Sequence, residues 1–274
     1  MLGALAGPAA QRASVFALSR CLRREPFSAK PRGPSSPSSS RFEGNVRYSQ
    51  LGRDRALARD VARRALVASA ASEPQRTPQV LVPIAEGSEE MEAVIVIDVL
   101  RRAGVDVTVA SVEETLQVKA SRGVNLVADV PIAECASKDY DLIVLPGGMP
   151  GAERLRDSSE LQALLEHHAN KSGGSFGVSV AAICAAPAVV LQPAGLLEGK
   201  KSTCHPAFEA ELADASCASS RVVHSGGVMT SKGPGTAMEF ALALVKQLCG
   251  EDAMRSVAGP MVMLPGWDTT TLSC

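Results

Sequence analysis

Short apolar runs alternate with helix-length amphipathic segments over most of this 274-residue chain, and this alternation restricts the fold more than any other feature of the sequence. Residues 79–84 and 105–111 are rich in β-branched side chains, which is typical of buried strands. Between them, residues 91–102 have the spacing of an amphipathic helix, with Ser88 as the expected N-cap and Gly104 as the stop. These segments form one β-α-β unit, and such a unit joins parallel strands.

The same alternation continues through the rest of the chain. Further strands are predicted at residues 140–145 and 176–183, with a hairpin at 222–231. Further helices are predicted at residues 159–170, 185–197 and 236–248. The sequence therefore predicts one α/β domain at residues 78–265, in which helices cover both faces of a mostly parallel sheet. Residues 266–274 are expected to form a C-terminal tail.

The leader, residues 1–77, differs in composition from the rest of the chain. Residues 1–78 carry 13 Arg and one Lys against five acidic residues, whereas the formal net charge of the whole chain is only -1. The leader is also rich in Ser, Ala and Pro, and residues 33–40 contain no apolar side chain that could pack. This composition predicts an organellar transit peptide, with the chloroplast favoured and the mitochondrion as the alternative. An untargeted disordered tail is the other interpretation of the same residues.

Composition and charge exclude several classes of function. The basic leader lacks interleaved aromatic residues and the acidic body lacks a basic stripe, so we expect no sequence-specific binding of nucleic acid. The longest strongly apolar run without a charge has 14 residues, whereas a membrane-spanning helix needs about 20. The chain contains no Cys-x-x-Cys pair, P-loop or dinucleotide fingerprint, and we predict neither a metal nor a cofactor.

Cys184 is the first candidate for chemistry because it directly follows the predicted strand 176–183. Ligands of such sheets bind beyond the carboxyl ends of the strands. A helix is expected to start just after Cys184, and its dipole and free N–H groups would lower the pKa of the thiol. A buried structural cysteine is the alternative interpretation.

Acids and glycines after two other predicted strands could act on this thiol. Glu92 begins an apolar stretch, so burial would raise the pKa of its carboxyl, and Glu89 lies on the same helical face. Stabilisation of the helix dipole is the alternative role for these acids, and it is the preferred one for Glu90. Gly147 and Gly148 could aim backbone N–H groups at an oxyanion, unless they only form a tight turn.

His205 lies 21 residues beyond Cys184 and is the best candidate for the imidazole that nucleophilic cysteines commonly need. The other three histidines are expected elsewhere. His167 and His168 are predicted at an exposed helix end, and His224 is predicted in the hairpin.

Five stretches of the chain together point to a known family. They are EGSEEMEAVIVIDVLRRAGVDVTVAS (86–111), DLIVLPGGMPGAERL (141–155), VAAICAAPAVVL (180–191), TCHP (203–206) and SKGPGTAMEFALALV (231–245). They resemble, in order, the DJ-1/ThiJ/PfpI family and specifically its parkinsonism-associated deglycase branch. The resemblance implies a flavodoxin-like three-layer sandwich and a homodimer.

The resemblance also implies a role for each matching residue. Cys184 would be an oxidation-sensitive nucleophile, Glu92 the carboxyl that hydrogen-bonds its thiol, and Glu89 a neighbouring acid. His205 would supply the imidazole. Arg122 would enter the site from the partner subunit.

The activity implied by the resemblance is cysteine-dependent conversion of α-oxoaldehydes. The protein would be a glutathione-independent glyoxalase that forms lactate from methylglyoxal, or a deglycase of early glycation adducts on proteins and nucleotides, with Gly148 and Ala185 holding the oxyanion. A thiol redox sensor or chaperone-like protein with incidental catalysis is the alternative. The animal branch has Gly at Ala186, so an extra methyl group is expected to narrow the pocket. PfpI-type peptidases have His at Ala185, so peptidase activity is not expected.

Overall fold

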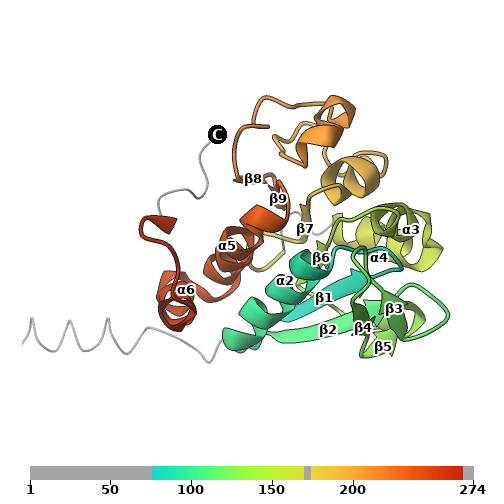
Figure 1. Ribbon diagram of the computed structural model, residues 1–274, viewed down its shortest axis with the longest axis horizontal. Coiled ribbons are helices and arrows are strands. Elements are labelled where there is room, and N and C mark those ends of the chain that lie inside the picture. The colour runs from blue at the N-terminus through green and yellow to red at the C-terminus, as the bar shows by residue number, and fades with distance from the viewer. Residues whose placement is uncertain (1–75, 170–173, 268–274) are drawn as a thin grey trace, which may run out of the picture. The chain divides into compact units, whose positions relative to one another are not determined.

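The computed structural model describes residues 76–169 and 174–267, so all of the leader except Arg76 and Thr77 lies outside the described residues. The strands of the main sheet are β1 (Gln79–Ile84), β2 (Asp106–Ser111), β5 (Val130–Pro131), β6 (Leu142–Leu145), β7 (Val180–Ile183), β8 (Val222–Ser225) and β9 (Val228–Ser231). Their order is β5-β2-β1-β6-β7-β9-β8 (Figure 1). Every neighbouring pair is parallel except β8–β9, which is the predicted hairpin.

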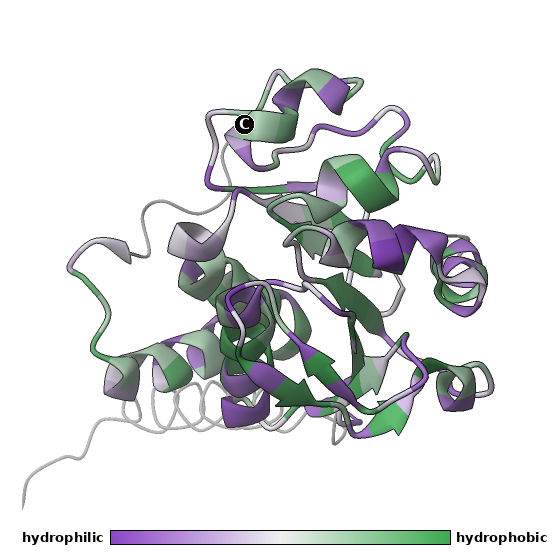
Figure 2. Ribbon diagram, turned by 45° about the vertical axis from the view of Figure 1, so that its right-hand side comes forward, coloured by the Kyte–Doolittle hydropathy of each residue, from purple (hydrophilic) through white to green (hydrophobic). Residues whose placement is uncertain are grey.

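Helices cover both faces of this sheet because alternate residues of each strand point to opposite sides. The helices are α2 (Glu90–Arg102), α3 (Gly151–Asp157), α4 (Ser159–Ala169), α5 (Ala237–Cys249) and α6 (Glu251–Ala258). Val80 and Val82 of β1 pack in the core with α2 and α5, whereas Leu81 packs in the core with α3 and α4. Figure 2 shows that the central strands between these layers are hydrophobic. The predicted flavodoxin-like three-layer sandwich is therefore confirmed.

Several boundaries differ from the prediction. α2 begins at Glu90 and its N-cap is Glu89, because the Ser88 side chain instead accepts the N–H of Ala85 at 2.9 Å. β7 begins only at Val180, since Gly177 has a left-handed φ of 74° that interrupts an extended chain. The helix predicted at 185–197 is reduced to the π-helical turn η2 (Pro187–Leu191).

Short elements were missed, because each spans eight residues or fewer, which is less than the window of about 11–18 residues over which a period is recognised. They include α3, α6, the hairpin β3 (Gln117–Lys119) and β4 (Asn125–Val127), and the 3₁₀ turns η1 (Ile132–Cys135), η3 (Pro206–Glu211), η4 (Pro234–Thr236) and η5 (Gly259–Met261). Among the described residues, no helix has the length and apolar character needed to span a bilayer.

Candidate active site

Cys184 follows β7 in the middle of the sheet, in a backbone conformation that is rare for residues other than glycine. Its φ is 65°, in the left-handed region, and the residue is 9% exposed. Its N–H donates to the carbonyl of Ser231 at 3.0 Å, and its own carbonyl accepts the N–H of His205 at 2.8 Å. Two neighbouring segments therefore hold the strained turn from both sides.

Two glycines after β6 bring backbone against this turn. A Cβ atom at Gly147 would lie 2.6 Å from the Cβ atom of Cys184, so only glycine fits there. The N–H of Gly147 donates to Oε2 of Glu92 at 2.8 Å. This donor is already used, so the prediction that Gly147 serves an oxyanion is wrong. The N–H groups of Gly148 and Ala185 instead face the sulfur of Cys184.

Glu92 lies in the first turn of α2 and is completely buried beside the thiol. Its N–H donates to Oε2 of Glu89 at 2.8 Å, and the N–H of Glu89 donates to the carbonyl of Gly147 at 2.9 Å. The start of α2 is thus attached to the end of β6. Oε1 of Glu92 has no hydrogen-bond partner of normal geometry among the described residues, and the carboxyl interacts with the thiol of Cys184.

Burial is the main cause that raises the pKa of Glu92 to about 7, and the charge of Glu89 adds to the effect. Burial and the Glu92 carboxylate likewise raise the pKa of Cys184 to about 12. The prediction of a lowered thiol pKa is therefore wrong, because desolvation and a neighbouring acid outweigh the N–H donors of Gly148 and Ala185.

The carboxyl and the thiol titrate together as a pair. The pair loses its first proton near pH 7, and the second is held to a much higher pH. Above neutral pH the pair therefore holds one proton, and this proton resides mainly on the sulfur of Cys184, because the thiol has the higher pKa. A thiolate is present whenever that proton lies on the Glu92 carboxyl, because the neutral carboxyl does not repel the negative charge on sulfur.

His205 is half-buried at the start of η3. Its Nδ1 accepts the N–H of Ala207 at 3.2 Å, so the neutral imidazole carries its proton on Nε2. The ring packs edge-on against Phe208, with 6.2 Å between the ring centroids. This tautomer makes His205 a proton donor and leaves the Glu92 carboxylate as the base.

Arg122 is exposed on the turn between β3 and β4, and Glu90 fixes this turn. The Glu90 carboxylate accepts the Ser121 hydroxyl at 2.9 Å and the N–H of Arg122 at 2.9 Å. Burial favours the neutral carboxyl of Glu90 and so raises its pKa, but these hydrogen bonds favour the carboxylate and outweigh burial, so the pKa of Glu90 is lowered. Glu90 is therefore an anchor for the turn as well as a residue of the helix start. No hydrogen bond in the described part of the chain joins Arg122 to Cys184.

His168 was predicted at an exposed helix end, and this is wrong. The side chain is completely buried, with Nδ1 3.0 Å from the carbonyl of Leu164 and Nε2 2.8 Å from that of Tyr140. The helix end packs inward because η1 and β6 cover it.

The sequence model of the DJ-1/PfpI family matches residues 78–247. The chain belongs to the DJ-1/PfpI family. Within it, the relatives found place the chain in the DJ-1 branch. Protein DJ-1 homolog B of Arabidopsis thaliana is 47% identical over 190 residues, which are 69% of this chain and 42% of that protein. The chain thus spans less than half the length of that relative.

Two further DJ-1 relatives match over almost their whole length. Glutathione-independent glyoxalase DJR-1.2 of Caenorhabditis elegans is 36% identical over 191 residues, 69% of this chain and 97% of that protein. The solved structure of oxidized Toxoplasma gondii DJ-1 is 46% identical with a TM-score of 0.64, and the match covers 68% of this chain and 98% of that one.

Ala186, whose methyl group is expected to narrow the pocket, lies two residues after Cys184 and is completely buried. Its φ is -60°, in the right-handed helical region, so glycine is not needed there. The side chain is completely buried in the core on the α3–α4 side of the sheet.

Gly233 is the site residue of this DJ-1 protein that sequence reasoning missed. A Cβ atom there would lie 3.6 Å from Cδ2 of His205, 3.9 Å from Sγ of Cys184 and 4.0 Å from Oε1 of Glu92. β9 runs parallel to β7 and ends two residues earlier, so the rule of strand ends could have found it. The sequence instead indicated only a hairpin at this strand.

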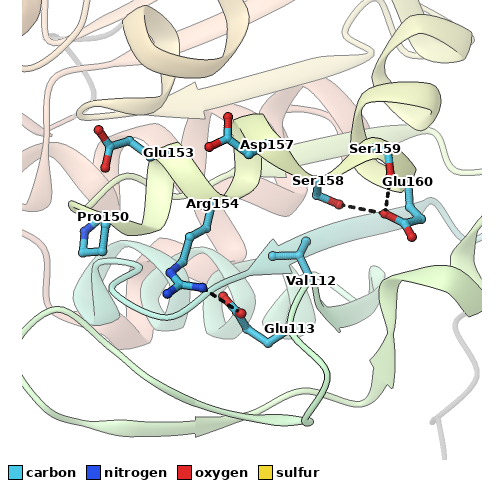
Figure 3. Close-up of a pocket in the computed structure, with 9 residues that line it drawn as sticks. All are labelled: Val112, Glu113, Pro150, Glu153, Arg154, Asp157, Ser158, Ser159 and Glu160. Atoms are coloured by element: carbon cyan, nitrogen blue, oxygen red, sulfur yellow. Dashed lines mark hydrogen bonds and ion pairs between the residues drawn. The ribbon is translucent and has the colours of Figure 1, made fainter.

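A separate hollow lies where α3 and α4 begin (Figure 3). It is lined by Val112, Glu113, Pro150, Glu153, Arg154, Asp157, Ser158, Ser159 and Glu160. Arg154 forms an ion pair with Glu113 at 3.0 Å, so its charge is already compensated. None of the residues around Cys184 lines this hollow. Within the described ranges, no three His, Cys, Asp or Glu side chains are grouped as a metal site would require.

Proposed function

We propose that this DJ-1 family member is a glutathione-independent glyoxalase that converts methylglyoxal-type α-oxoaldehydes to hydroxyacids and so protects against carbonyl and oxidative stress. The observation that carries the proposal is a buried carboxyl with a raised pKa beside the thiol of Cys184. The name of the Caenorhabditis relative supports the same reaction. Early glycation adducts of proteins and nucleotides are a second substrate class, because release of the amine or thiol from the adduct regenerates the same aldehyde.

The first step is addition of sulfur to the aldehyde. With the proton of the pair on Glu92, the thiolate of Cys184 forms a bond to the aldehyde carbon, and the C=O π electrons move to oxygen. The N–H groups of Gly148 and Ala185, which face the sulfur, stabilise this oxyanion. The Glu92 carboxyl then gives its proton to the oxygen, which leaves a hemithioacetal and a carboxylate.

The second step moves hydrogen between the two carbons. The Glu92 carboxylate removes the proton from the carbon that bears sulfur, and Nε2–H of His205 donates to the neighbouring ketone oxygen. The Glu92 carboxyl then gives its proton to the second carbon, while the hydroxyl on the sulfur-bearing carbon returns a proton to Nε2 of His205, and this leaves a thioester and a neutral imidazole. Water cleaves the thioester to the hydroxyacid and the free thiol of Cys184. One carbon is oxidised while its neighbour is reduced, so the reaction consumes only water.

The raised pKa of Glu92 predicts a pH dependence of stability. Its ordinary pKa is 4.5 and its folded pKa is about 7, so the folded state binds more protons between these values. The contribution of Glu92 to the free energy of unfolding is complete below pH 4.5 and is lost as pH rises through 7. This loss amounts to about 3 kcal/mol.

Glu92→Gln keeps an oxygen for the N–H of Gly147 but cannot ionise. Urea unfolding of both proteins from pH 4.5 to 8 should show the variant gaining about 3 kcal/mol relative to the wild type as pH rises. A difference between the two proteins that does not change with pH would show that Glu92 titrates normally.

We propose a homodimer formed through the start of α2 and the β3–β4 hairpin. Met91, Val94, Val124 and Val127 are each at least 47% exposed. The hydrogen bonds from the 121–122 turn to Glu90 hold the hairpin beside the helix start. A second copy would cover this apolar surface, and its Arg122 would then reach the neighbouring site.

Val94→Glu is expected to halve the mass measured by light scattering after size exclusion, because a charge would be buried in the interface. Leu264→Glu changes a residue that is even more exposed, on a different part of the surface, and should leave the mass unchanged. A dimer that survives Val94→Glu would place the interface elsewhere.

A thiol redox sensor is the second candidate, and the N–H groups of Gly148 and Ala185 favour it because they could hold the oxygens of a sulfinate. Two equivalents of peroxide would each transfer one oxygen to sulfur and leave as water. The relative of known structure from Toxoplasma is described as oxidized. Mass spectrometry after mild peroxide should find sulfinate at Cys184 and none at the completely buried Cys204.

We propose that the leader directs the chain to the chloroplast, with the mitochondrion as the alternative, because it is rich in Arg, Ser and Ala and poor in acids. Residues 1–77 fused to a fluorescent protein should carry it into chloroplasts of leaf cells. Diffuse cytosolic fluorescence would contradict targeting.

A further inference from the structure

We infer that Gly233 leaves open the space that the substituent of the α-oxoaldehyde occupies, so that the residue at position 233 sets the largest substrate that the site accepts. The inference rests on the proposed glyoxalase function and adds a determinant of specificity to it. Its basis is the position of Gly233 among three functional side chains, together with the lack of any other need for glycine there.

The position follows from the three distances to a Cβ atom at residue 233. Such an atom would lie 3.9 Å from Sγ of Cys184, 4.0 Å from Oε1 of Glu92 and 3.6 Å from Cδ2 of His205. It would thus touch the nucleophile, the base and the imidazole at once. A carbon under attack must approach sulfur to about 3–3.5 Å, so the reacting carbon and its substituent need this same space.

Neither backbone conformation nor packing requires glycine at this position. Gly233 has φ 160° and ψ -169°, an extended conformation that any residue adopts. The three distances of 3.6–4.0 Å are ordinary van der Waals contacts. By contrast, a Cβ atom at Gly147 would lie only 2.6 Å from another atom. What a side chain at 233 would remove is therefore open space.

The surrounding backbone is also held firmly, so a new methyl group could not easily move away. The Thr236 hydroxyl contacts both the N–H of Gly233 at 3.1 Å and its carbonyl at 2.9 Å. The N–H of Thr236 donates to the same carbonyl at 2.8 Å. A methyl group at position 233 would therefore stay between Cys184, Glu92 and His205.

Gly233→Ala is the variant that tests the inference. We expect kcat/KM for methylglyoxal to fall about 10-fold or more relative to glyoxal, which lacks the methyl group, and phenylglyoxal to be affected still more strongly. Gly235→Ala is the matched control, because no atom lies within 4 Å of a Cβ atom there. It should keep the wild-type ratio of the three substrates.

Alkylation of Cys184, followed by mass spectrometry, separates this inference from the proposed function. If wild-type protein converts no aldehyde, the glyoxalase proposal fails. The thiol of Cys184 should nevertheless be alkylated more slowly in Gly233→Ala than in Gly235→Ala, and the rate with N-ethylmaleimide should fall more than the rate with the smaller iodoacetamide. Unchanged substrate ratios together with unchanged alkylation would overturn the inference. Failure of Gly233→Ala to fold, seen by circular dichroism, would also overturn it, because packing would then require the glycine.

Discussion

Replacing Cys184 with Ser is expected to reduce lactate formation from methylglyoxal by about 1,000-fold or more. A serine hydroxyl ionises far less readily than a thiol, and a Glu92 carboxylate with a pKa of about 7 is too weak a base to generate an alkoxide. The backbone of the turn is held by the N–H and carbonyl of residue 184, which serine retains. The free energy of unfolding should therefore change by less than about 1.5 kcal/mol.

Lactate measured without glutathione is the decisive readout for this variant. Cys204→Ser is the matched control, because Cys204 is a completely buried thiol that lies beside His205 and donates to its carbonyl at 3.4 Å. It should retain turnover even if it is less stable. Full turnover by Cys184→Ser would remove this sulfur from the mechanism, whereas absent turnover in the wild type would favour the redox sensor.

The main features of the fold could be predicted because each depends on local sequence. The strand β1 and the hairpin β8–β9 show β-branched runs bounded by turn residues, and α2 and α5 show a clear helical period. The rule that parallel sheets bind ligands beyond the carboxyl ends of strands then indicates Cys184 and Glu92. Those two residues indeed lie together.

The remaining errors concern properties that arise only in three dimensions. The direction of the thiol pKa depends on how deeply Cys184 is buried and on the charge of Glu92, which is 92 positions earlier in the chain. The N–H of Gly147 is used by the same distant carboxylate. Gly233 follows the end of β9, but the sequence indicated only a hairpin at that strand, and a residue without a side chain gives no chemical reason to single it out.

Replacing Gly148 with Ala is expected to lower the free energy of unfolding by about 4 kcal/mol or more, at the upper end of single substitutions. Gly148 has a φ of 87°, which costs a residue with a Cβ atom about 1–2 kcal/mol. The new Cβ atom would also lie 2.4 Å from the carbonyl oxygen of Gly87 and 2.5 Å from the backbone nitrogen of Glu89. Backbone atoms cannot rotate away as side chains do, so the loop after β1 would have to move.

Gly104→Ala separates these two causes, because Gly104 has a similar φ of 77° but no atom within 4 Å of its Cβ position. It should cost only about 1–2 kcal/mol by urea unfolding. Equal losses for both variants would show that the close approach of the two loops does not matter. Movement of the β1 loop would also break the bond from the N–H of Glu89 to Gly147, which sets the start of α2. Any folded Gly148→Ala protein should therefore lose turnover as well, since Glu92 would no longer be held against Cys184.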